Sequence, residues 1–109
     1  MRFSMALAFS CATLLACTAH SHAGESAAIE VSMQQFGFVP AAITVPAGAT
    51  VTWTNRDTVP HTVTSADGAF DSGPIEPGKS FQRTVQKPAA YHCIYHPSMT
   101  GSIELSPAR

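Results

Sequence analysis

Three residue types that can bind a metal ion lie within seven positions near the C-terminal end of the chain. Cys93, His96 and Met99 form a C-x2-H-x2-M motif, in which two residues separate each donor from the next. A second histidine, His61, lies 32 residues upstream of Cys93, at the start of another predicted strand. If folding brings these two segments together, two imidazoles, one thiolate and one thioether meet at one point. The four side chains are therefore candidates for a single metal site.

This set of donors restricts the choice of metal. Zinc sites are built from cysteine, histidine and carboxylate side chains, and a thioether is uncommon among them. Two histidines and a cysteine with a weak axial methionine are the ligands of blue-copper sites, which transfer electrons. The soft sulfurs favour Cu(I), and the imidazoles suit both oxidation states of copper. The sequence thus predicts one type 1 copper ion with four ligands: His61, Cys93, His96 and Met99.

Each of these donors has a simpler interpretation when it is considered alone. A single cysteine is most often a small buried apolar residue, a histidine at a strand end usually makes one hydrogen bond, and a methionine usually fills a core. Three donor types in one seven-residue segment favour the metal interpretation over these alternatives. His92 is not included, because it precedes Cys93 in an extended strand and its side chain should point to the opposite face.

Short β-strands are the elements that must position the donors. Apolar residues alternate with polar ones at a period of two, and no segment has the 3.6-residue period of a helix of three turns. Eight prolines and seven glycines in 109 residues supply the turns. Arg83 shares a face with two apolar residues, which places it at a sheet edge or next to a bulge. We expect an all-β fold, a β-sandwich of about seven short strands, at residues 29–38 (with a bend), 43–45, 50–55, 61–65, 81–85, 91–93 and 102–105.

The N-terminal segment has the composition of an export signal. Arg2 precedes a fourteen-residue apolar run, which is too short to span a bilayer and is typical of a secretory signal. Cleavage after Ala23 would give a signal peptide at residues 1–23 and a domain at residues 24–109. The alternative is a lipoprotein signal at residues 1–16, with lipid attached to Cys17. Both interpretations predict an exported, periplasmic protein without a membrane span.

Charge and cysteine content exclude several classes of protein. The formal net charge is −1, which gives no electrostatic reason to expect binding to nucleic acid. With 12 % charged and 45 % hydrophobic residues, the chain is not intrinsically disordered. Cleavage after Ala23 would remove two of the three cysteines and leave Cys93 alone, so no disulfide is expected.

Two segments carry a resemblance to a known family. The residues VTWTNRDTVPHTVTS, followed by YHCIYHPSMTGSIEL, resemble the cupredoxins, and among these the amicyanins most closely because they share the short C-x2-H-x2-M motif. The resemblance covers about residues 29–105. It implies a Greek-key β-sandwich and copper ligation by the four donors named above. Thr62 stands where related proteins commonly have an asparagine that braces the ligand loops, and Tyr95 replaces a common proline. Thr62 could make a weaker form of the same bracing bond.

The function expected from these features is that of a periplasmic one-electron carrier. An alternative is a copper-binding module for copper handling or tolerance, without a dedicated redox partner. We do not expect an enzyme, because a cysteine hydrolase needs an adjacent base and an oxyanion site. The expected partners are redox proteins, such as a periplasmic dehydrogenase and a c-type cytochrome, which would dock onto a monomer near His96 and Pro97. Val59 and Pro60, which precede His61, are expected to contribute to the same apolar surface.

Overall fold

Eight β-strands make up the part of the chain that the structure describes. The computed structural model of the chain describes residues 28–107, and the predicted export signal with both of its cleavage sites lies outside them. Within residues 28–107 no helix is long and apolar enough to cross a membrane. The strands are β1 (Ala28–Gln34), β2 (Gly37–Val39), β3 (Ala42–Val45), β4 (Ala49–Asn55), β5 (Thr64–Ser65), β6 (Ser80–Val85), β7 (Ala89–Cys93) and β8 (His96–Leu105).

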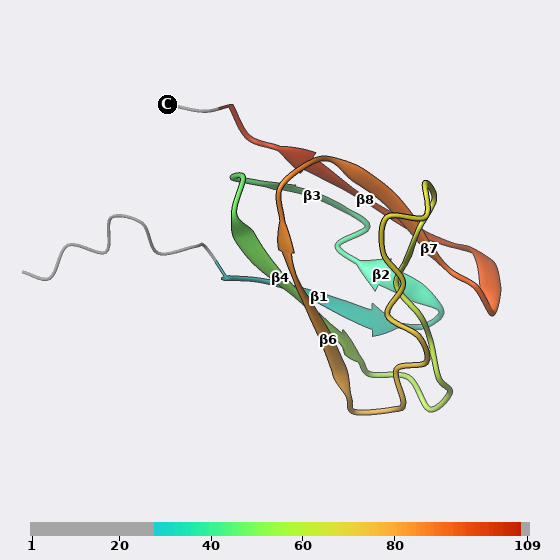
Figure 1. The fold of residues 1–109 in the computed structure, drawn as a ribbon. Helices are drawn as coiled ribbons and strands as arrows, with labels where there is room; N and C mark the ends of the chain where they lie inside the picture. Colours follow the sequence, from blue (N-terminus) through green and yellow to red (C-terminus); the bar gives the residue numbers. More distant parts are fainter. Residues whose placement is uncertain (1–27, 108–109) are drawn as a thin grey trace, which may run out of the picture.

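The strands form two four-stranded sheets that pack as a sandwich (Figure 1). One sheet has the order β2-β1-β4-β6 and the other has the order β3-β8-β7-β5. β1 runs parallel to β4 and β3 runs parallel to β8, whereas the other neighbours are antiparallel. The predicted all-β sandwich is confirmed. There are eight strands rather than the seven expected, because the predicted bend in the first strand is a turn at Gln35 and Phe36 that separates β1 from β2.

The core lies between the two sheets and follows the alternation seen in the sequence. In β4 every second residue is buried, from Ala49 to Asn55, while the threonines between them are half-buried. Trp53 is fully buried, and its ring lies edge-to-face with that of Tyr91 at 5.5 Å between centroids. Complete burial of a large apolar side chain stabilises the fold by about 1.5–3 kcal/mol. The buried residues of β4, β7 and β8 therefore fix the sheets that carry the candidate ligands.

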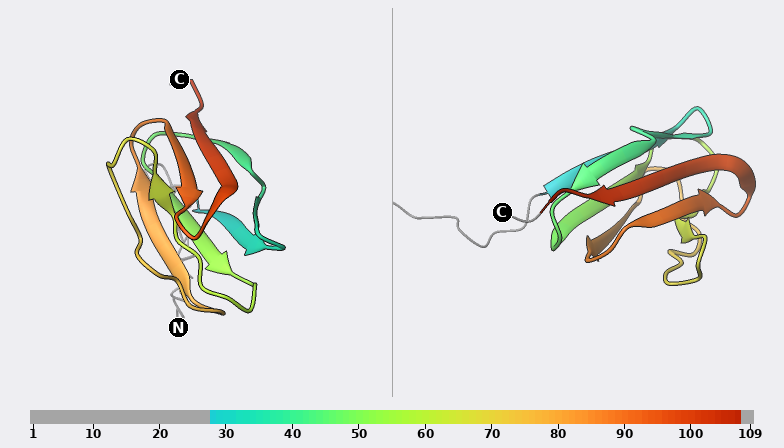
Figure 2. Two further views of the ribbon diagram at one scale, coloured as in Figure 1. Left: turned by 90° about the vertical axis from the view of Figure 1, so that its right-hand side faces the viewer. Right: turned by 90° about the horizontal axis from the view of Figure 1, so that it is seen from above.

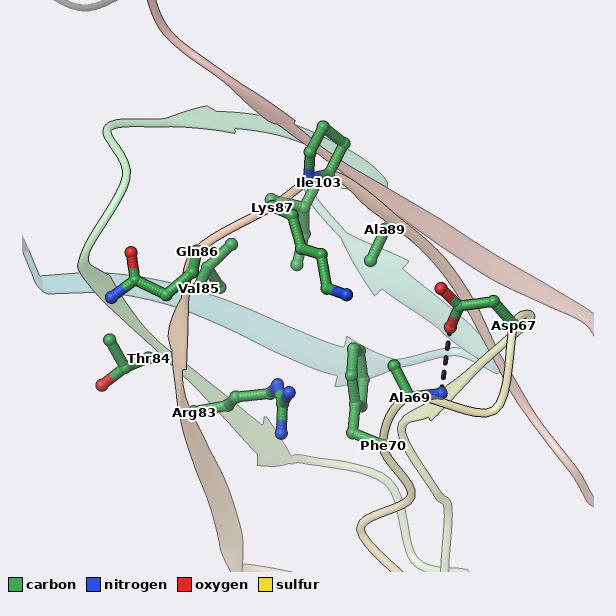
Figure 3. A pocket seen from close by; sticks show the side chains of 11 residues that line it. Asp67, Ala69, Phe70, Arg83, Thr84, Val85, Gln86, Lys87, Ala89 and Ile103 are labelled. Atoms are coloured by element: carbon green, nitrogen blue, oxygen red, sulfur yellow. Dashed lines mark hydrogen bonds between the residues drawn. The ribbon is translucent and has the colours of Figure 1, made fainter.

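Arg83 lies at a sheet edge, which is one of the two positions that its place among apolar residues predicted. β6 is the outer strand of its sheet, and the Arg83 guanidinium carbon lies 4.5 Å from the centroid of the Phe70 ring. The Arg83 cation thus lies over the face of the Phe70 ring, beside the outer strand of the sheet. Beside this pair is a pocket of about 80 Å³ between the β6–β7 connection and the loop after β5 (Figure 3). Its lining includes no histidine, cysteine or methionine, so this pocket is separate from the candidate metal site.

Two strands differ from the sequence-based expectation in ways that affect the site. β8 begins at His96 rather than near residue 102, so the ligand segment is the tip of a hairpin and not a long loop. The expected strand at residues 61–65 is reduced to Thr64–Ser65, and His61 forms an isolated bridge with Ile75. The β1–β2 turn, the loop after β4 and the β7–β8 turn lie at the same end of the sandwich, which faces the viewer in the left panel of Figure 2.

Candidate metal centre

Three of the four predicted ligands converge at this end of the molecule. Cys93 Sγ lies 3.7 Å from His61 Nδ1 and 3.7 Å from His96 Nδ1. All three donor atoms lie within 4.8 Å of one another. Bonds of a first-row metal ion to imidazole nitrogen and thiolate sulfur are about 2.0–2.3 Å long, so one ion can contact all three atoms. Met99 is buried in β8, three residues after His96.

The β7–β8 hairpin positions two of these ligands. Cys93 ends β7 and is paired with His96, the first residue of β8. The register of the hairpin shifts between His92 and Cys93: His92 pairs with Thr100 and Cys93 with His96, so residues 97–99 of β8 have no partner in β7. His92 is paired with Thr64 of β5, and the cluster of donors consists of His61, Cys93 and His96.

His61 is completely buried and is held from two directions. Its backbone N–H donates to the Ile75 carbonyl at 3.1 Å, and its carbonyl accepts from the Ile75 N–H at 2.7 Å. The ring Nε2 lies 2.7 Å from Asp57 Oδ2. A carboxylate at Nε2 keeps the proton on that nitrogen, so that Nδ1 presents its lone pair to the metal site. Asp57 therefore sets both the tautomer and the orientation of the His61 ring.

Thr62 connects the two ligand segments. Its backbone N–H points at Cys93 Sγ at 3.4 Å, and its Oγ1 accepts a hydrogen bond from the Ile94 N–H at 2.9 Å. The first contact stabilises negative charge on the sulfur, and the second fixes the start of the hairpin turn. The bracing bond expected at Thr62 is therefore present.

Asn55 organises the loop between β4 and His61. Its fully buried side chain donates to the carbonyl of Val59 at 2.7 Å and to that of Ile75 at 2.9 Å, and its Oδ1 accepts from the Asp57 N–H at 2.9 Å. Every polar atom of the amide group is thus used in shaping this loop. The loop in turn delivers Asp57 to His61.

Asp57 also holds the β1–β2 turn. Its carboxylate accepts from the Gln35 N–H at 2.7 Å and from the Phe36 N–H at 3.0 Å. Burial acts to raise the pKa of Asp57, but the hydrogen bonds from Phe36, His61 and Gln35 outweigh it and lower the pKa below its ordinary value. The ionised carboxylate is the form that this site stabilises.

Asn55, Asp57 and Phe36 also shape the site, and none of them was predicted to do so from the sequence. The one available signal was a carboxylate four residues before a predicted ligand. Phe36 gave none, because its role depends on a turn conformation. Its ring lies edge-to-face with those of His96, at 4.8 Å, and His61, at 5.7 Å between centroids.

Comparison with known proteins identifies the family. The cupredoxin-like domain matches residues 6–103 of the chain. The chain belongs to the cupredoxin-like family. A search of curated proteins gave no match.

Solved cupredoxin structures agree with this assignment. A methionine-to-alanine variant of amicyanin with Cu(I) is 26 % identical, with a TM-score of 0.68 over 72 % of this chain and 82 % of that one. A purple cupredoxin from Nitrosopumilus maritimus is 28 % identical, with a TM-score of 0.66 over 72 % of this chain and 99 % of that one. The resemblance to cupredoxins, and to amicyanin in particular, is confirmed.

The donors of this cupredoxin fit copper. Its four candidate ligands are arranged as a type 1 copper site, with buried sulfur donors and two imidazoles whose Nδ1 atoms face the cysteine. When bound, copper supplies a one-electron couple between Cu(II) and Cu(I). The protein supplies the fixed positions of the donors through Asp57, Thr62 and the β7–β8 hairpin.

Proposed function

We propose that this cupredoxin is a periplasmic one-electron carrier whose copper ligands are His61, Cys93, His96 and Met99. The observation that carries the proposal is the convergence of three N and S donors within 4.8 Å in a cluster held by hydrogen bonds. Amicyanin and a purple cupredoxin are its structural neighbours. A rigid set of ligands suits an electron carrier because little rearrangement is then needed when the metal changes oxidation state.

The surface near the site suits a brief encounter with a redox partner. His96 is half-buried, while Phe36, Ile94 and Tyr95 expose large apolar side chains in the turns that surround it. Pro97, next to His96, is also exposed. Weak redox encounters bury less than about 1,200 Å² in total. We propose that partners such as a periplasmic dehydrogenase and a c-type cytochrome dock here, on a monomer.

Copper handling without a redox partner is the competing function. Such a role would benefit from further copper-binding thioethers, but Met33 is completely buried in the core away from solvent. The described residues include two methionines, Met99 at the site and Met33 in the core, and neither is a further thioether at the surface. This favours the carrier.

The proposed location rests on the N-terminal sequence. We propose export with cleavage after Ala23, and attachment of lipid at Cys17 is the alternative. Mass spectrometry of the protein purified from periplasmic and membrane fractions distinguishes the two, because lipidation adds the mass of acyl chains to a fragment that begins at Cys17.

Copper loading followed by redox cycling tests the function. The Cu(II) protein should show an intense thiolate-to-copper charge-transfer band, and Cys93→Ser should abolish the band while the circular dichroism of a folded β-protein is retained. A carrier should also pass through repeated reduction and oxidation in the presence of a Cu(I) chelator without losing copper. A colourless copper-loaded protein would contradict the type 1 site, and transfer of Cu(I) to the chelator in the first cycle would favour copper handling.

A further inference from the structure

Phe36 covers the two candidate histidine ligands from an element that supplies no ligand itself. It lies in the turn between β1 and β2, and its ring contacts both His61 and His96 edge-to-face, at interplanar angles of 84° and 77°. The side chain is nevertheless 54 % exposed, so its other side faces solvent. The ring therefore lies at the surface against both imidazoles, beside a His96 that is itself half-buried.

The backbone conformation at this position is unfavourable for phenylalanine. Gln35 and Phe36 have φ angles of 51° and 57°, and they connect two strands that pair at Gln34 and Gly37. Two-residue hairpin turns of this left-handed type favour asparagine and glycine, which tolerate positive φ. An aromatic residue here is both strained and partly exposed to water. Asparagine would form this turn with less strain, so the contacts of the ring with His61 and His96 are the candidates for what offsets the strain.

One carboxylate holds both the turn and a ligand. Asp57 accepts the backbone N–H groups of Gln35 and Phe36, and the same side chain contacts Nε2 of His61. The position of the Phe36 ring is thus tied to the position of the His61 ring through a single side chain. A strained turn persists only where its surroundings determine it in this way.

We propose that Phe36 is a cover which limits the access of small molecules to the cluster of His61, Cys93 and His96, and that Asp57 is the residue that positions this cover. Anions, chelators and thiol reagents that approach the buried donors, His61 and Cys93, from this side would have to displace the ring first. A protein partner, in contrast, can contact the exposed side of the ring without moving it. The proposal concerns access to the side-chain cluster, so it holds whether the protein carries electrons or handles copper.

The reactivity of Cys93 in the metal-free protein tests the cover directly. The full chain is treated with iodoacetamide, and mass spectrometry follows the peptide that contains Cys93, which separates it from Cys11 and Cys17. Phe36→Asn removes the ring and tolerates the turn, and we expect it to raise the alkylation rate of Cys93 about tenfold or more. Gln35→Asn is the matched control, because it relieves the same kind of strain at the neighbouring position and leaves the ring in place. Equal rates in these two variants would overturn the proposal.

Two further measurements separate the cover from a loss of stability and test the role of Asp57. We expect the urea midpoint of unfolding of Phe36→Asn to be no lower than that of the original protein. If the midpoint were lower, the faster alkylation would be explained by unfolding, and the proposal that Phe36 is a cover would be overturned. Asp57→Ala, with Asp57→Asn as the milder variant, should also accelerate alkylation. When Phe36→Asn is combined with either Asp57 variant, the alkylation rate of Cys93 should be no higher than in Phe36→Asn alone. If both Asp57 variants alkylate at the original rate, Asp57 does not position the cover.

A third measurement uses the copper-loaded protein. Azide, a small anion that binds Cu(II), should perturb the visible spectrum of Phe36→Asn at a concentration at least tenfold lower than in Gln35→Asn. An identical azide response in both variants would overturn the cover for the loaded state. Failure of copper to bind at all would contradict the proposed copper site, whereas the alkylation result would still decide the role of Phe36.

Discussion

Thr62 joins the two ligand segments through one backbone N–H and one hydroxyl. Thr62→Val keeps the shape and the backbone contact to Cys93 but removes the acceptor of the Ile94 N–H, together with the hydroxyl contact to Thr64. This hydrogen bond is part-buried, and a typical intramolecular hydrogen bond contributes about 0.5–1.5 kcal/mol to stability. We expect the free energy of unfolding of the metal-free protein to fall by that amount in chemical denaturation, and Thr62→Ser, which keeps the hydroxyl, to lose less. A valine variant as stable as the original protein would show that the hydroxyl does not brace the hairpin.

Met99 is the candidate ligand whose substitution should change the reduction potential without preventing copper binding. Met99→Gln replaces a soft thioether with a harder amide oxygen, which favours Cu(II) over Cu(I). The potential measured by voltammetry should therefore decrease. Met99→Leu, which removes the donor without adding an oxygen, should shift the potential in the opposite direction. A potential that is unchanged in both variants would place Met99 in the core rather than at the metal.

Residues with distinctive chemistry could be predicted from the sequence, and residues that act through conformation could not. Cys93, His61 and His96 were predicted from donor type and spacing, and the structure brings them together. The loop-bracing bond of Thr62 was expected from the resemblance to the cupredoxins, in which an asparagine commonly stands at this position. Asp57 acts on a turn more than twenty residues away in sequence, and Phe36 acts through a backbone conformation that its residue type disfavours. Local sequence contains no signal for either relationship.

The β7–β8 hairpin is the element on which the site depends most. Tyr91 of β7 is paired with Gly101 of β8, and the aromatic ring lies over the glycine. A Cβ atom at Gly101 would overlap the ring of Tyr91. The hairpin therefore combines a large residue and a residue without a side chain at one pair of positions, and the ring packs against Trp53 and Phe38 in the core.

Gly101→Ala should consequently destabilise the domain. Overpacking of a well-packed interior costs about 1–3 kcal/mol. We expect the free energy of unfolding to fall by an amount in this range or above it. Ser102→Ala, one residue further along the same strand, is the matched control and should have a much smaller effect. Adding Tyr91→Leu to Gly101→Ala should recover part of the loss, because the smaller side chain relieves the overlap. No recovery in the double variant would mean that the ring is not the source of the cost.

Strand existence was more predictable than strand limits. The period of two was sufficient to predict the sandwich and most of its strands, because alternate burial is what that pattern produces. The limits depend on pairing partners that are distant in sequence. β8 extends back to His96 because it pairs with β7 as far as Cys93, and residues 61–63 leave their expected strand because His61 is bridged to Ile75 instead.

At the scale of the whole molecule, the site and the charged pocket occupy different places. Three of the candidate ligands lie in the β7–β8 hairpin near its tip, where Cys93 pairs with His96, and His61 meets them from the segment after β4. The pocket beside Arg83 and Lys87 includes Ala89 and Ile103, which pair at the other end of the same hairpin (Figure 3). The apolar turns around His96 and the charges around the pocket are therefore separated by the length of a strand pair.

This arrangement predicts that the effect of an added charge on electron exchange depends on where it is placed. Tyr95→Lys puts a cation on an exposed side chain next to His96, and two copies that approach through this end then repel each other. We expect electron self-exchange, measured by NMR line broadening in mixtures of reduced and oxidised protein, to slow about tenfold at low ionic strength. Salt should restore part of the rate, because screening acts over about 8–10 Å at 0.10–0.15 M. Gln86→Lys adds the same charge beside the pocket and is the matched control, because it changes the net charge equally and leaves the apolar end unaltered. If both variants exchange electrons at the original rate, electrons leave the protein by another face; if both slow equally, net charge rather than docking at His96 controls the encounter.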